Sequence, residues 1–222
     1  RCSRDWSSDG VLFRSIDAVG PSIASIVIGR ADGTATTSVG NATFGNNVTI
    51  QQGGTGGALV VDGALTTATS GRSINLLAGS GNSGTFTLAS TGSIASGSGS
   101  IVIRADSLSM GTAVANAVAG SGTLTIRPTT AGRDIVIGGP GATPDLGIDL
   151  PAVAAFSDGF SGITIGDAAS GTGSVSVAAA VSFQDALSVF GGAFSAGSNA
   201  LGTTAGNDLT LQARSGGIGN NV

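Results

Sequence analysis

Lysine, glutamate, histidine and tyrosine are all missing from this 222-residue sequence. All nine basic residues are arginine, and all thirteen acidic residues are aspartate. Without histidine or lysine the chain cannot form a Ser-His-Asp triad or a Ser-Lys pair, which excludes the common routes to an activated serine. Lysine and glutamate also favour exposed helix faces, so their absence argues against a helical protein.

Cysteine and tryptophan each occur once, at Cys2 and Trp6, in a stretch that we set aside. The segment Asp5-Trp-Ser-Ser-Asp-Gly-Val-Leu-Phe-Arg-Ser15 resembles the translation of a common DNA-sequencing adapter after one inserted base. We therefore expect residues 1–15 to be an artefactual or disordered segment, and the chain to be a fragment at both ends. Without Cys2, the remainder has no disulfide and no cysteine-based zinc site.

Charge and hydropathy argue against three further classes of protein: nucleic-acid-binding, membrane-spanning and disordered. The formal net charge is −4 and the basic residues do not cluster, so the chain lacks the positively charged surface that binds nucleic acid. No apolar run is long enough to span a bilayer. The mean hydropathy of +0.37 argues against a disordered chain, because enough apolar surface is present to form a core.

The clearest feature is a segment that occurs twice, as Ile26-Val-Ile-Gly-Arg-Ala-Asp-Gly-Thr34 and as Ile163-Thr-Ile-Gly-Asp-Ala-Ala-Ser-Gly-Thr172. Matching apolar residues follow at a nearly constant separation, for example Phe44 with Phe183. Such a constant separation indicates an internal duplication. Since Pro140 and Pro144 interrupt strand pairing, we predict modules at residues 16–145 and 146–222, the second of them truncated.

Within each module the pattern predicts short strands joined by glycine-rich turns. Apolar and polar residues alternate in most of these segments, so that one face of each strand is buried and the other is exposed to solvent. The expected strands are Val48–Ile50, Ala58–Val61, Ser73–Leu77, Thr85–Leu88, Ser100–Arg104, Thr123–Arg127 and Asp134–Gly138. Related phrases recur at the spacing typical of solenoid coils: Ile74-Asn-Leu-Leu-Ala78, Ile101-Val-Ile-Arg-Ala105 and Leu124-Thr-Ile-Arg-Pro128. This spacing predicts an all-β solenoid of stacked coils with parallel sheets.

A short helix is expected at the start of each module. Apolar residues lie at i, i+3 and i+7 in Ile16–Ile23 and in Val153–Phe160, which is helical spacing. Asp149 is a plausible N-cap, Pro151 suits the first turn, and Gly159 would end the second helix.

The Ile-x-Ile-Gly repeats and the closing Leu209-Thr-Leu-Gln-Ala-Arg-Ser-Gly-Gly-Ile218 resemble large bacterial exoproteins. The nearest families are filamentous-haemagglutinin-like adhesins and other two-partner-secretion or autotransporter passengers. This resemblance implies a right-handed parallel β-helix, secretion to the cell surface, and a role as a stalk or adhesive surface. Host or matrix glycans or proteins would then bind loops or further modules, and neighbouring solenoid modules would be the other partners. It carries over no functional residue, so we expect no catalytic, cofactor-binding or metal-binding residue and no enzyme activity.

The competing hypothesis is a carbohydrate-active β-helix enzyme, a polysaccharide hydrolase or lyase. Its candidate carboxylates are Asp145, Asp149, Asp158 and Asp167. A glycosidase needs two carboxyl groups about 5–9 Å apart across the sugar, one of them with a raised pKa. Three aspartates facing one groove would support an enzyme, whereas dispersed turn aspartates favour a structural repeat. A third possibility is a surface-layer repeat without affinity for glycans.

Weaker candidates have ordinary structural explanations. Gly206-Asn-Asp-Leu-Thr-Leu211 and the turn aspartates Asp32 and Asp62 lack the tandem repeats of a calcium motif, so β-turns are expected. Asn41 and Asn47 begin glycosylation triplets of a kind common by chance. Phe183, Phe190 and Phe194 could form a sugar-stacking strip, but we expect them in the core. Arg30, Arg104 and Arg127 are expected just beyond strand ends, reaching solvent.

Overall fold

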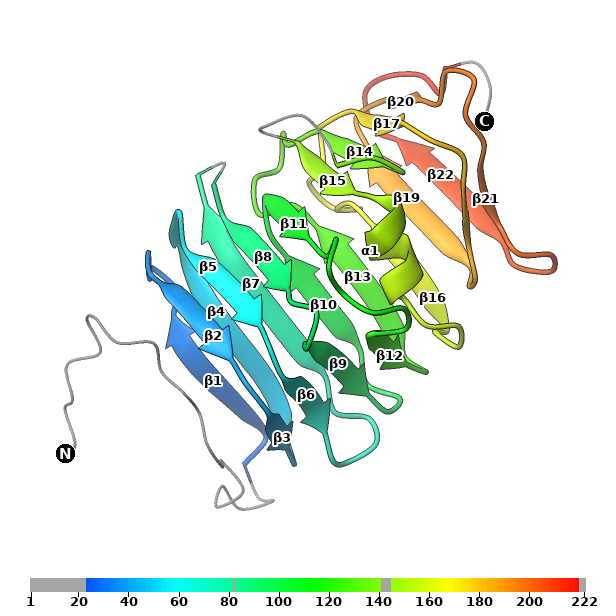
Figure 1. Ribbon diagram of the computed structural model, residues 1–222. Coiled ribbons are helices and arrows are strands. Elements are labelled where there is room, and N and C mark those ends of the chain that lie inside the picture. The colour runs from blue at the N-terminus through cyan, green and yellow to red at the C-terminus, as the bar shows by residue number, and fades with distance from the viewer. Residues whose placement is uncertain (1–22, 82, 141–144, 220–222) are drawn as a thin grey trace.

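The computed structural model describes residues 23–81, 83–140 and 145–219, which are mostly β-strand (Figure 1). The backbone forms a solenoid of about eight turns, so the predicted all-β parallel solenoid is confirmed. Every third strand joins one eight-stranded parallel sheet, called here the long sheet. Its strands are β1 (Ser25–Arg30), β4 (Asn47–Thr55), β7 (Ile74–Ser80), β10 (Ile101–Arg104), β13 (Thr123–Arg127), β16 (Gly162–Ile165), β19 (Leu187–Gly191) and β22 (Leu209–Ala213).

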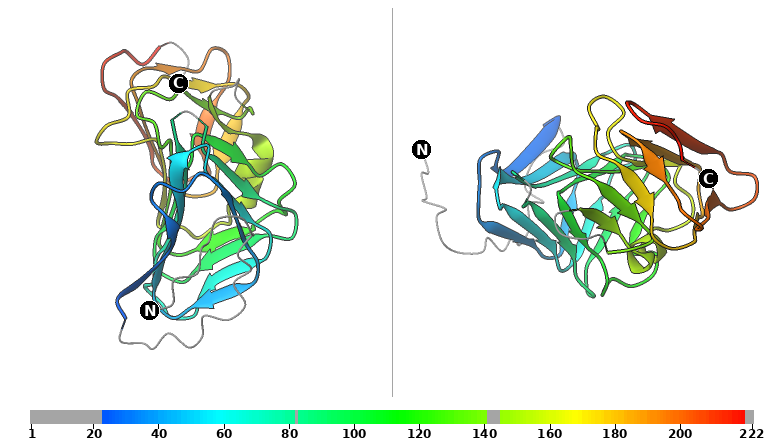
Figure 2. Two further views of the ribbon diagram at one scale, coloured as in Figure 1. Left: turned by 90° about the vertical axis from the view of Figure 1, so that its left-hand side faces the viewer. Right: turned by 90° about the horizontal axis from the view of Figure 1, so that it is seen from above.

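Smaller parallel sheets form the remaining walls of the solenoid (Figure 2). In the first half, one wall contains β2 (Thr36–Val39), β5 (Ala58–Val61), β8 (Thr85–Leu88) and β11 (Ser107–Ser109), and the other contains β3 (Ala42–Phe44), β6 (Ala64–Thr67), β9 (Ser93–Ser96) and β12 (Val118–Gly120). In the second half, the walls contain β14 (Ile135–Ile137), β15 (Leu146–Ile148), β17 (Val175–Val177) and β20 (Phe194–Ser195), and β18 (Val181–Phe183) with β21 (Leu201–Thr203).

One coil is longer than the others and interrupts the smaller walls. It runs from Leu124 to its partner in the long sheet, Ile163, and is much longer than the preceding coil, which runs from Ile101 to Leu124. The extra residues contain β15, which pairs with β14, and the helix α1 (Leu150–Ala155). The long sheet nevertheless continues in register through this coil, and the module boundary at 145/146 stays a prediction.

The helix confirms one predicted start and corrects its end. Asp149 is the N-cap, and its Oδ1 accepts a hydrogen bond from the Ala152 N–H at 2.9 Å. The helix ends at Ala155, before the predicted end at Gly159, because Phe156 adopts an extended conformation and bridges to Val118 in the solenoid wall. The helical spacing predicted in this segment therefore extends beyond the helix. Of the other predicted helix, residues 16–22 lie outside the described residues.

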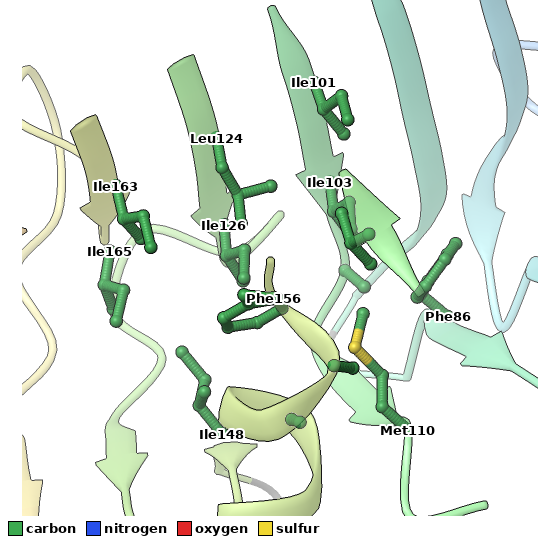
Figure 3. Packing of buried hydrophobic residues seen from close by; sticks show 14 of the residues in the cluster. Phe86, Ile101, Ile103, Met110, Leu124, Ile126, Ile148, Phe156, Ile163 and Ile165 are labelled. Carbon is green, nitrogen blue, oxygen red and sulfur yellow. The ribbon is translucent and has the colours of Figure 1, made fainter. Parts of the chain in front are cut away.

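Stacked aliphatic side chains form the core between the walls. Ile101, Leu124 and Ile163 occupy one register position on successive strands of the long sheet, and Ile103, Ile126 and Ile165 occupy the next inward position. All six are at most 1% exposed, and Figure 3 shows them facing Phe156 and Ile148 across the interior. Burial of each such side chain stabilises the fold by about 1.5–3 kcal/mol, and it depends on the neighbouring coils.

The predicted repeat is visible strand for strand. β1 to β7 in the first half correspond in order to β16 to β22, with the residue separations expected from the sequence. Phe44 ends β3 and Phe183 ends β18, and both side chains are buried in the core. The duplicated unit is therefore two coils of the same solenoid.

A ladder of polar side chains follows the corner where each coil enters the long sheet. Asn47 donates to the carbonyl of Ala24 at 3.1 Å and accepts from the Ser73 N–H at 2.9 Å. Ser73 Oγ accepts from the Ser100 N–H at 3.2 Å, and Ser100 Oγ from Thr123 Oγ1 at 3.0 Å. These bonds satisfy backbone groups where the strand ladder begins and hold adjacent coils in register.

Candidate functional site

Charged side chains gather at one edge of the long sheet, where β10 and β13 end. Arg104 and Arg127 are the last residues of these strands and occupy the same register position. Because Ile103 and Ile126 point into the core, the two arginines lie on the outer face. Burial and the neighbouring positive charge of Arg127 lower the pKa of Arg104. The sequence predicts Arg30, Arg104 and Arg127 just beyond strand ends and in solvent, but each is the last residue of its strand. Arg30 is exposed as expected, whereas Arg104 and Arg127 are half-buried.

Asp167 reaches this edge from the next coil. Its Oδ2 accepts a hydrogen bond from Arg127 Nη1 at 2.7 Å, while its carboxylate also accepts from the Ala169 N–H at 2.9 Å and from Ser170 Oγ at 3.0 Å. Burial acts to raise the pKa of Asp167, but these hydrogen bonds and the charge of Arg127 outweigh burial and lower it. Asp167 is therefore an ionised turn residue and lacks the raised pKa of a general acid.

A second ion pair lies deeper, between Asp106 and Arg133. Their side chains are 0% and 2% exposed, and Arg133 Nη2 lies 3.6 Å from Asp106 Oδ2. Asp106 also accepts hydrogen bonds from the N–H groups of Thr129 and Thr130, at 2.9 and 2.8 Å, and from Thr130 Oγ1 at 2.8 Å. Asp106 thus fixes the turn that follows β13, and that turn carries Arg133.

A cavity of about 60 Å³ lies between these two pairs. Arg104, Arg133, Asp167 and Phe190 contribute to its wall, together with the turn at residues 128–131. Neither Nε nor Nη2 of Arg133 has a hydrogen-bond partner among the described residues, and the same holds for Nε of Arg104. The wall contains two arginines and one aspartate, and the ion-pair partners behind it, Arg127 and Asp106, cancel one another, so the cavity carries an excess positive charge in an otherwise acidic chain.

The predicted enzyme carboxylates do not form a common site. Asp149 caps α1 and Asp167 binds its own turn and Arg127, whereas Asp158 is exposed and Asp145 half-exposed. Within the described part of the chain, no group of three or more His, Cys, Asp or Glu residues is placed to hold a metal ion.

The turns considered for calcium make ordinary turn contacts. Asn207 donates from Nδ2 to the carbonyl of Gln184 at 2.6 Å, and its N–H bonds the Thr204 carbonyl at 3.1 Å. Asp32 pairs with Arg30 at 3.0 Å on the surface, and Asp62 is exposed. The segments at residues 30–33 and 204–207 thus form the expected β-turns, closed by Gly33 N–H to the Arg30 carbonyl and Asn207 N–H to the Thr204 carbonyl.

The three phenylalanines do not form a sugar-stacking strip. Phe183 and Phe194 are buried in the core, as expected. Phe190 differs, because it lies half-buried on the outer face of β19 and lines the charged cavity.

Of the two glycosylation triplets, Asn41 is exposed and accepts from the Ala64 N–H at 2.8 Å, whereas the Asn47 side chain belongs to the corner ladder.

Sequence reasoning did not identify Asp106, Arg133 or the buried Asp185, which accepts from the N–H groups of Gly159 and Phe160. One usable signal was present. The recurring segments Ile101–Ala105 and Leu124–Pro128 align Arg104 with Arg127, and Arg104-Ala-Asp106 repeats the triplet Arg30-Ala-Asp32. Alignment of the coils therefore places like charges on adjacent strands, but it does not reveal the buried partners.

No protein-family model matches the chain, and no curated protein or solved structure is significantly similar to it. The one helix in the described ranges, α1, is too short to cross a membrane.

Proposed function

We propose that this chain is the structural stalk or adhesive repeat region of a large, exported bacterial exoprotein, with no chemistry of its own. The observation that carries this proposal is the uninterrupted solenoid. Eight parallel strands continue in register through the long coil, over a core of stacked aliphatic residues. Such a stack transmits stability only between neighbouring coils, which suits an extended spacer of repeated modules.

The distribution of carboxylates favours this function over a polysaccharide hydrolase or lyase. The candidate aspartates serve separate turns and caps, and the one in the cavity wall, Asp167, has a lowered pKa. A glycosidase instead requires a facing pair, one of which holds its proton near neutral pH.

The test combines an activity assay with localisation. The purified chain is incubated with neutral, uronic-acid and sulfated polysaccharides, and new reducing ends and unsaturated products are measured. We expect no release of these products above that of a heat-denatured control. In the localisation experiment, we expect an antibody against the chain to label intact cells that express the parent gene. Product release that Asp167→Asn abolishes would establish an enzyme and overturn the proposal, as would labelling only after cell lysis.

A further inference from the structure

We propose that the cavity between Arg104 and Arg133 binds a small oxyanion group such as sulfate, either free or carried by an acidic glycan. This inference goes beyond the stalk or adhesive role and does not depend on it. It starts from Arg133, whose side chain is 2% exposed and whose Nε and Nη2 donate no hydrogen bond to the described residues. A buried donor without a partner is costly, so a bound group that accepts from it is favoured.

The geometry of the ion pair leaves room for such a group. Arg133 lies 3.6 Å from Asp106, which is contact between charges but too long for a hydrogen bond. Asp106 directs its carboxylate toward Thr129 and Thr130, which donate three hydrogen bonds to it. Asp106 Oδ2 therefore faces Nη2 of Arg133 without a hydrogen bond, so Nε and Nη2 both keep donors for an oxyanion, which a planar guanidinium suits.

Arg104 supplies the charge that would hold the anion. Arg127 is paired with Asp167 and Arg133 with Asp106, whereas Arg104 has no ion pair within the described ranges. Its nearest charged neighbour on the sheet is another arginine, Arg127, at the same register position. The charge of Asp167 already offsets part of this repulsion, and an anion beside Arg104 would offset more of it.

The size and access of the cavity also suit a small anion. Its volume of about 60 Å³ is several times the roughly 10–15 Å³ needed for one water. Ala131 and Ser170, which lie at its rim, are exposed, so a ligand can enter from solvent. Phe190 forms an apolar part of the wall, against which the ring of a sulfated sugar could pack.

Isothermal titration of the whole chain with sodium sulfate, at constant ionic strength set with sodium chloride, tests the proposal. We expect saturable binding to the wild type and about tenfold or greater weakening in Arg104→Gln, since one charge-assisted interaction is lost. The matched control is Arg30→Gln, which removes the same charge from β1, outside the cavity, and should bind as the wild type does. Absence of saturable binding, or equal binding by Arg104→Gln and the wild type, would overturn the proposal.

A second pair of variants locates the anion without altering an arginine. Ala131→Asp adds a negative charge at the exposed rim and should abolish sulfate binding, whereas Ala131→Ser should preserve it. Circular dichroism checks that both variants are folded. If Ala131→Asp is folded and still binds sulfate normally, the anion lies elsewhere and the proposal is wrong.

The source of the oxyanion is distinguished by repeating the titration with a heparin-derived tetrasaccharide. Tighter binding than sulfate, lost in Arg104→Gln and Ala131→Asp, would identify a sulfated glycan and would support an adhesive role. Sulfate binding without this gain would identify a free anion, and adhesion would then not use this cavity.

Discussion

Gly29 and Gly166 have the same backbone conformation in the two copies of the repeated segment, with φ angles of 90° and 89°. A Cβ atom on Gly29 would collide with the carbonyl oxygen of Gln51, and one on Gly166 with that of Phe190. Each of these oxygens belongs to the next strand of the long sheet. The fourth position of Ile-x-Ile-Gly thus requires glycine for its left-handed φ and for the close approach of a neighbouring coil.

Replacement of Gly166 by alanine tests this requirement. We expect Gly166→Ala to lower the free energy of unfolding by about 1–3 kcal/mol, because the variant combines a disfavoured φ with a clash against backbone. Urea denaturation followed by circular dichroism measures the change. The control is Gly202→Ala in β21, where an added Cβ meets no atom within 4 Å and the change should stay within about 0.5 kcal/mol. Equal losses in the two variants would contradict this interpretation.

The buried pair of Asp106 and Arg133 should behave as a coupled unit. Asp106→Asn leaves the guanidinium of Arg133 buried without its counter-charge, and we expect a loss of about 3–5 kcal/mol in the free energy of unfolding. Arg133→Met should also be destabilising, because the carboxylate of Asp106 then loses its counter-charge. The double variant should lose less free energy of unfolding than the sum of the losses in the two single variants, since neither buried charge remains. Thermal and urea unfolding of all four proteins completes the cycle, and additive losses would show that the two charges do not interact.

The corner ladder makes Asn47 a structural residue. Asn47→Ala removes the acceptor for the Ser73 N–H and the donor to the Ala24 carbonyl, so we expect a loss of about 1–3 kcal/mol on urea unfolding. Asn47→Asp keeps the acceptor, so its free energy of unfolding should fall less than that of Asn47→Ala. Asn75→Ala, on the outer face of the adjacent strand β7, is the matched control and should change stability little. If Asn75→Ala is as destabilising as Asn47→Ala, the ladder does not stabilise this corner.

The architecture could be predicted from the sequence because the solenoid repeats its local pattern. The alternation in Ala58–Val61, Thr85–Leu88 and Thr123–Arg127 gives the observed bounds of β5, β8 and β13. The end of α1 was not predictable in this way. Phe156 and Phe160 keep helical spacing and are both buried, but Phe156 is extended and bridges to Val118 in the wall, and Phe160 follows a turn at residues 158–159.

The charged cluster was less accessible to sequence reasoning, because its members come from different coils. Arg127 and Asp167 are far apart in the sequence because the long coil inserts β15 and α1 between their strands, and they meet because β13 and β16 pair in the long sheet. Asp106 follows β10 and Arg133 follows β13, and neither the phase of the alternation nor a known motif relates them. Local pattern specifies the coil, whereas contacts between coils depend on the length of each loop.

The pH dependence of stability tests the environment of Asp167. Its pKa is lowered in the folded chain, where the hydrogen bonds and the charge of Arg127 outweigh burial, so ionised Asp167 stabilises the fold above its unfolded pKa of about 3.9. This contribution is lost as the pH falls through the unfolded and then the folded pKa. Asp167→Asn should therefore be less stable than the wild type near pH 7, with a difference that shrinks near pH 3. Urea midpoints at both pH values measure it, with the exposed Asp158→Asn as the control. A difference that is unchanged or larger at the lower pH would show that ionised Asp167 does not stabilise the fold.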